Sequence, residues 1–240
     1  MDTQGLIDNR NIDLWNTLCT VCEINIQREK RSTYYVFSKN NKTIIYVPLG
    51  DNDPAYFTHE LLHVFLRIKD VFIGAGLKLS IKESKVLSNI FSDNLIEHIG
   101  NCLDHIKMFP EFLKLGYDPE KFLSDYSENK LTKENISKIK KHFITKGLFK
   151  KVFYNATAIG LYIGKYFAAV SCPNKSIDYF NQLTDLKKID QELYRILEDF
   201  IIAWNTFDFN DKDPITSGYH LLLFDFIDKL EKWANGKTIK

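Results

Sequence analysis

Two histidines and a glutamate within five residues are the groups in this sequence best suited to chemistry. His59, Glu60 and His63 form a His-Glu-x-x-His motif inside the apolar run 57–66. Residues four apart on a helix share a face, so the two imidazoles can bind a single metal ion. Glu60 lies one step round the helix and can take a proton from a water molecule that this metal activates. The motif predicts metal-assisted hydrolysis, with Zn²⁺ as the cofactor and Glu60 as the catalytic base.

A catalytic zinc site usually has three protein ligands, so a third ligand is expected on another element. The helical region 88–105 is the expected source, because four of the six histidines lie between positions 59 and 105. Glu97 is the preferred ligand, since its four-residue spacing to Asn101 lets that amide orient a ligating histidine. The residues that compete with it for this position are His98, Asp93 and His105.

Around Glu97 the sequence resembles a known family. The segment Glu97-His98-Ile99-Gly100-Asn101 is similar to the second-helix motif Glu-x-x-Ala-Asn/Asp of the ImmA/IrrE-type metallopeptidases, which are related to thermolysin. Gly100 replaces the alanine, and Pro110 lies at the matching distance after Phe109, where that family usually has methionine. The resemblance covers roughly residues 30–110. The histidines at 98 and 105 depart from the family pattern.

The resemblance implies a zincin-type catalytic part in which His59, His63 and Glu97 bind zinc. It further implies a zinc-dependent endopeptidase that hydrolyses a peptide bond in a specific protein substrate. The alternative that it leaves open is a regulatory or binding protein with a metal site and little hydrolytic activity.

Peptide hydrolysis also needs a donor to the tetrahedral oxyanion and a surface for the substrate. His105 is the candidate donor, two turns after Glu97 on the same predicted helix, and Tyr117 is the second candidate. The segment 43–47 is expected to bind an extended protein or peptide substrate by strand addition. The sequence does not specify an oligomeric state.

The sequence patterns around these groups predict an α+β fold that is mostly α. Apolar residues at helical spacing predict an opening helix over about 10–27. The β-rich runs 33–37 and 43–47 flank a polar turn and predict a hairpin. The residues 51–54 supply N-cap and first-turn signals for the motif helix.

The remainder of the chain is predicted to be helical. A glycine-containing loop over 71–78 is expected to precede a long helix from about 81 to 108, which Pro110 ends. Nearly all of the chain after this helix has helical patterning. The expected organisation is therefore a zincin-like catalytic part over 1–117 and a helical C-terminal part over 118–240 that packs against it.

The composition of the chain indicates which partners and which cellular compartment are expected. Thirty-two basic and thirty-one acidic residues give a formal net charge of +1, which offers no broad field for nucleic acid or anionic lipid. The N-terminus has neither the basic start nor the apolar stretch of a signal peptide. The apolar segment 152–172 contains Asn155 and Lys165, which favours a buried helix over a membrane span. The four cysteines make a poor disulfide framework, so a cytoplasmic protein is expected.

Overall fold

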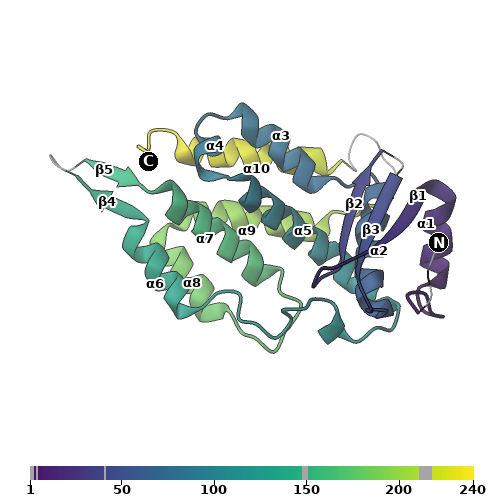
Figure 1. Cartoon of the computed structure of the whole chain (residues 1–240). Coiled ribbons are helices and arrows are strands. Elements are labelled where there is room, and N and C mark those ends of the chain that lie inside the picture. The colour runs from purple at the N-terminus through teal and green to yellow at the C-terminus, as the bar shows by residue number, and fades with distance from the viewer. Residues whose placement is uncertain (1–2, 4, 41, 148–150, 211–217) are drawn as a thin grey trace. The chain divides into compact units, whose positions relative to one another are not determined.

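The computed structural model describes residues 3, 5–40, 42–147, 151–210 and 218–240. It is mostly helical with two small sheets, which confirms the predicted α+β, mostly α, fold class (Figure 1). Within these residues no helix combines the length and the apolar character needed to cross a membrane. The elements are α1 (Ile12–Val21), β1 (Glu23–Glu29), β2 (Tyr35–Lys39), β3 (Lys42–Pro48), α2 (Pro54–Ile68), α3 (Ile73–Glu83), α4 (Leu87–Ile90), α5 (Asp93–Lys114), η1 (Pro119–Lys121), α6 (Lys133–His142), β4 (Ile144–Lys146), β5 (Val152–Tyr154), α7 (Ala156–Val170), α8 (Phe180–Ile189), α9 (Gln191–Thr206) and α10 (Tyr219–Ala234).

The chain forms two compact units. The first unit comprises residues 1–72 and 104–127, and the second comprises 73–103 and 128–240. The sequence predicted one boundary near residue 117, whereas here the chain enters the second unit, returns to the first and leaves it again. Helix α5 belongs to both units, and its residues from Asp104 onward lie in the first.

A three-stranded sheet in the order β1-β3-β2 forms one layer of the first unit. Strand β2 pairs antiparallel with β3, which confirms the predicted hairpin, and β1 pairs parallel with the other side of β3. The expectation that the segment 43–47 binds a substrate by strand addition is therefore wrong, because β3 is the central strand and already has a partner on each side. The outer edges of this sheet belong to β1 and β2.

Strand β1 takes the place of the end of the predicted opening helix. Helix α1 stops at Val21, and the chain is extended from Glu23. Along β1 the buried Ile24 lies between two exposed residues, which is the period of two that a half-buried strand shows. The helical spacing that runs up to Cys22 hid this change of period.

Helix α2 carries the His-Glu-x-x-His motif and begins where the sequence predicts. The Asp53 carboxylate accepts a hydrogen bond from the Ala55 main-chain N–H at 2.9 Å, and Pro54 occupies the first turn. Phe57, Leu61 and Val64 recur on one side of the helix and pack into the core of the first unit. Burial of this stripe fixes the rotation of α2 and hence the direction of the histidines.

The second unit is a helical assembly around aromatic residues of α7, α9 and α10. The rings of Phe200 and Phe226 stack at 4.1 Å between centroids, and the Trp204 indole donates a hydrogen bond to the Leu103 carbonyl at 2.9 Å. Several sequence expectations fail here. Residues 73–83 form helix α3 instead of a loop, and α5 continues through Pro110 to Lys114. The single helix expected over 81–108 is divided among the end of α3, the short α4 and α5. Within the part expected to be helical throughout, β4 and β5 pair as antiparallel strands.

Two glycines let α3 and α5 approach closely in this unit. A Cβ added to Gly100 would lie 3.0 Å from the Gly74 Cα, whereas a Cβ added to Gly74 would lie 3.7 Å from the Gly100 Cα. We expect Gly100→Ala to lower the free energy of unfolding by about 1 kcal/mol, because backbone must shift to admit the methyl group. In Gly74→Ala the added Cβ would lie at an ordinary van der Waals distance from Gly100, so this variant should leave the free energy of unfolding unchanged or raise it. Urea unfolding of the two variants measures the asymmetry, and equal effects would contradict it.

Candidate metal centre

The motif histidines face away from the core stripe of α2. His59 and His63 each lie two positions after a buried core residue, Phe57 and Leu61, which corresponds to a rotation of about 200° round the helix. The rigid packing of one side of α2 therefore directs the imidazoles to the other side. Helix α5 supplies His105 there.

His59, His63 and His105 form a group that can hold a metal ion. One ligand atom from each residue lies within 4.8 Å of the other two. The ring centroids are separated by 5.1 Å for His59–His63, 5.0 Å for His59–His105 and 5.6 Å for His63–His105. Three imidazoles this close together can serve as ligands of a single metal ion after small rotations of their rings.

His59 has the properties of a metal ligand. Its side chain is 9% exposed, and its Nδ1 is buried with no hydrogen-bond partner among the described residues. Burial, together with the nearby His105 and His63, holds the pKa of His59 well below its usual value. The ring is therefore neutral at pH 7 and has a lone pair to donate. A buried, unsatisfied nitrogen costs free energy that a bound metal would offset.

His63 is oriented by a buried carboxylate. Its Nδ1–H donates to Asp104 Oδ2 at 3.2 Å, which leaves Nε2 for the metal. Arg67 donates to the same oxygen at 2.6 Å, and Asp104 is 1% exposed. Burial would raise the pKa of Asp104, but the His63 hydrogen bond and the Arg67 charge outweigh it and hold the pKa below its usual value. The carboxylate stays ionised and fixes the His63 ring.

We expect Asp104→Asn to lower the free energy of unfolding by about 2–4 kcal/mol, since it removes the charge that pairs with Arg67 in a buried setting. The affinity of the histidine group for a metal ion should fall about tenfold to a hundredfold, because His63 loses its charged orienting partner. Urea unfolding and competition with a chromogenic chelator measure the two effects. Asp93→Asn is the matched control on the same helix. It breaks an exposed ion pair with Lys78 and should leave the free energy of unfolding nearly unchanged.

Glu60 lies beside this group and faces a cavity. The cavity has a volume of about 270 Å³ and belongs wholly to the first unit, and it is lined by residues 32–34, Asp51, Tyr56, His59, Glu60 and 122–124. Glu60 is 8% exposed. Burial raises its pKa, while the charges of His63 and Arg31 act in the opposite direction. A carboxylate with a raised pKa is a better proton acceptor at neutral pH than an exposed one.

Phe122 covers the histidine group from the segment after α5. Its ring centroid is 4.8 Å from that of His59 and 5.4 Å from that of His105. The same ring is fully buried and lines the cavity. An apolar wall beside the nitrogens excludes water and strengthens electrostatic interactions at this position. No sequence pattern marked Phe122 or Asp104 in advance.

The structure does not bring Glu97 into the histidine group. Its side chain is exposed, and so is that of Asn101, which was expected to orient a ligand. The His98 Nε2–H donates to the Gly164 carbonyl, with 3.1 Å between Nε2 and O, so its ring is engaged within the second unit. Asp93 pairs with Lys78 at 2.8 Å. Of the four residues that competed for the third ligand position, only His105 joins His59 and His63 in the part of the chain that is described.

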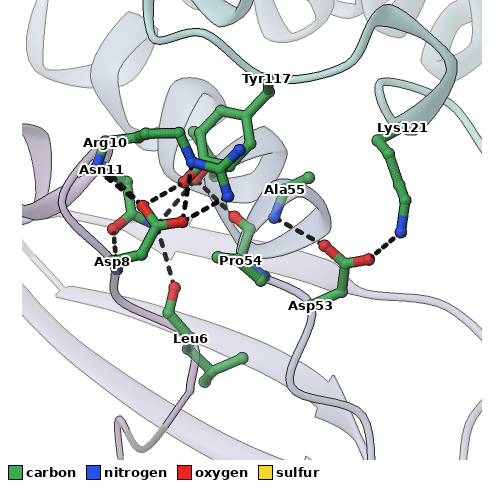
Figure 2. Close-up of polar contacts among 10 residues, drawn as sticks. Leu6, Asp8, Arg10, Asn11, Asp53, Pro54, Ala55, Tyr117 and Lys121 are labelled. Carbon is green, nitrogen blue, oxygen red and sulfur yellow. Dashed lines mark hydrogen bonds and ion pairs between the residues drawn. The ribbon is translucent and has the colours of Figure 1, made fainter.

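Tyr117, the second candidate for the oxyanion donor, serves a different network (Figure 2). Its hydroxyl donates to Asp8 Oδ1 at 3.0 Å, and the Arg10 guanidinium lies 3.9 Å from the ring centroid. Burial, with the carboxylate of Asp8, raises the pKa of Tyr117 to about 12. Asn11 extends the network to α2 by donating to Thr58 Oγ1 at 2.9 Å. Tyr117 therefore helps to hold the segment that carries His59 and does not line the cavity.

Comparison of the chain with protein-family models, with curated proteins and with solved structures found no match.

Proposed function

We propose that this protein is a zinc-dependent endopeptidase whose metal ligands are His59, His63 and His105. The observation that carries the proposal is the grouping of three imidazoles, one of which, His59, lines the same cavity as the buried Glu60. The sequence motif supplies two of the ligands and the base, and the fold supplies the third ligand from α5.

Three imidazoles and a neighbouring carboxylate suit zinc. Imidazole is a preferred ligand of this ion, and three protein ligands leave a position open for chemistry. The unpartnered Nδ1 of His59 and the Asp104-oriented ring of His63 both fit such an ion. When bound, zinc supplies Lewis-acid activation of water and polarisation of the scissile carbonyl.

Glu60 acts on the protons of the reaction. Its carboxylate accepts the proton of the attacking water and delivers it to the leaving amine. The cavity walls hold this carboxylate away from bulk solvent, so the proton is not lost between the two steps. His105 is assigned to the metal in this proposal, which replaces its expected role as the oxyanion donor. The hydroxyl groups of Ser32, Thr33, Tyr56 and Ser124 line the cavity and are candidate donors for that role.

The substrate is an extended peptide segment. Strand β2 pairs with β3 on one side only within the described chain, so its other edge offers main-chain groups to a peptide. The residues that line the cavity at 32–34 come immediately before β2. A peptide paired with β2 therefore continues toward Glu60.

Incubation of the full chain with an unfolded protein such as reduced casein tests the proposal. Mass spectrometry should detect internal peptide-bond cleavage by the zinc-loaded protein and none after removal of the metal with a chelator. Readdition of zinc should restore cleavage. A protein that binds zinc stoichiometrically and cleaves neither casein nor a diverse peptide library would contradict the proposed activity.

A further inference from the structure

We infer that the cavity beside Glu60 accepts a basic side chain, lysine or arginine, of the substrate, and that Asp51 selects it. This inference rests on the proposed function for its biological meaning, but the pocket can be tested by binding alone. Its basis is the set of side chains that line the cavity.

The charged groups that line this cavity are both acidic. They are Asp51 and the Glu60 carboxylate, and no lysine or arginine side chain is among the lining residues of the described chain. Arg31 acts against the charge of Glu60, and a zinc ion held at His59 would offset that charge further, so the Asp51 carboxylate is the group left in this cavity to attract a positively charged side chain and to repel an anionic one. Glu60 is already committed to the reaction, so Asp51 remains for recognition.

One carboxylate oxygen of Asp51 can accept a hydrogen bond from a basic side chain. Its Oδ1 accepts hydrogen bonds from the Tyr34 hydroxyl at 3.0 Å and from the Asp53 main-chain N–H at 2.9 Å. These two bonds fix the carboxylate, while Oδ2 receives no hydrogen bond from the described residues. Arg28 donates to the main-chain oxygen of Asp51 and to Asn52, and Lys121 pairs with Asp53. The Lys121 Nζ also lies 5.5 Å from the centroid of the Tyr56 ring, and Arg31 acts on Glu60, but no ion pair joins any cation to the Asp51 carboxylate among the described residues.

The walls of the cavity suit the stem and the head of a long basic side chain. Tyr34 and Tyr56 both line it, and their ring centroids are 6.0 Å apart at a tilt of 32°. Tyrosine faces attract ammonium and guanidinium groups and also cover apolar stems. Leu123 adds apolar surface from the opposite segment. A volume of about 270 Å³ accommodates one such side chain but not a folded domain.

Binding of matched amino-acid amides to the zinc-loaded full chain tests the pocket without any cleavage. The probes are N-acetyl-arginine amide and N-acetyl-citrulline amide, which have nearly the same shape and differ in charge. Calorimetry should show that the arginine amide binds about tenfold more tightly or better, as expected for a charge-assisted hydrogen bond. Equal affinities for the two probes would overturn the inference, and this comparison needs no variant.

Asp51→Asn should abolish the difference between the two probes. Asparagine keeps an acceptor oxygen for Tyr34 and Asp53, so the loop is retained while the charge is lost. Asp53→Asn is the matched control, because it removes a carboxylate two residues away that does not line the cavity and keeps a good helix N-cap. The control should retain the preference for arginine. Preference that persists in Asp51→Asn would overturn the assignment of Asp51.

The outcomes separate this inference from the proposed function. If arginine amide binds in an Asp51-dependent manner but no peptide is cleaved, the pocket stands and the peptidase proposal fails. If the wild-type protein cleaves peptides with no enrichment of lysine or arginine near the cleaved bond, the peptidase proposal stands and the pocket fails. Both hold if the cleaved sites are enriched in basic residues and Asp51→Asn raises KM for them with kcat little changed.

Discussion

Replacement of His105 by alanine should remove most of the zinc from the protein. With three histidines the site is expected to hold about one zinc ion per chain, and the two that remain on α2 bind the ion weakly. The apparent affinity should fall by about a thousandfold or more, since each imidazole contributes a large share of the binding free energy. Metal analysis after dialysis and competition with a chromogenic chelator measure the loss. The same result is expected for His59→Ala and for His63→Ala.

Two substitutions on the same helix serve as controls for His105→Ala. Glu97→Gln changes the residue that the resemblance favours, whose side chain is exposed, and His98→Ala changes a histidine bonded to the Gly164 carbonyl. Both variants should keep one zinc per chain. Loss of zinc from Glu97→Gln with retention in His105→Ala would restore the glutamate as the third ligand. A site of three neutral ligands also keeps the full charge of the ion, whereas a glutamate ligand would cancel one unit.

The motif helix could be predicted in detail because its signals are local. The capping aspartate at 53, Pro54 at the first turn and the apolar stripe of Phe57, Leu61 and Val64 all lie within a dozen residues. The hairpin of β2 and β3 was predictable for the same reason, since its strands are adjacent in the chain. The parallel pairing of β1 with β3 was not, because a non-local partner decides whether Ile24 lies in a strand or a helix.

The third ligand could not be chosen from sequence because it depends on how α5 packs. Glu97 and His105 are eight positions apart, about 12 Å along the helix axis, and either can face a partner helix depending on which half of α5 lies beside it. The structure places residues from Asp104 onward in the first unit, which brings His105 to the motif. Asp104 was overlooked for a related reason. Its partners His63 and Arg67 are 41 and 37 positions away, so no local spacing indicates a buried network.

Conversion of Glu60 to glutamine should abolish hydrolysis and leave the metal in place. The amide has nearly the same shape as the carboxylate but cannot accept a proton at neutral pH, so the cleavage rate should fall by about a hundredfold to ten-thousandfold. Zinc content should equal that of the wild-type protein, because the three histidines are unchanged. The measurements are cleavage of casein and metal analysis on the same preparation. Glu231→Gln, an exposed change on α10, is the control and should keep full activity. Wild-type cleavage by Glu60→Gln would exclude Glu60 as the base.

The stability of the metal-free protein gives an independent readout of the same substitution. Burial raises the pKa of Glu60, so its ionised form costs free energy in the folded state that glutamine does not. This cost is absent below the pKa of the unfolded carboxyl, about 4.5, and grows as pH rises through the folded pKa. Metal-free Glu60→Gln should therefore unfold at a higher urea concentration than the wild-type protein at pH 7, and the difference should narrow as pH falls toward 4.5. Glu60 therefore lowers the stability of the metal-free protein while it lies beside three imidazoles. A catalytic base is expected in such a position, whereas a residue with only a structural role is not. If the two proteins have equal stability across this range, the Glu60 carboxylate is not held in the buried state from which the proposed proton transfer starts.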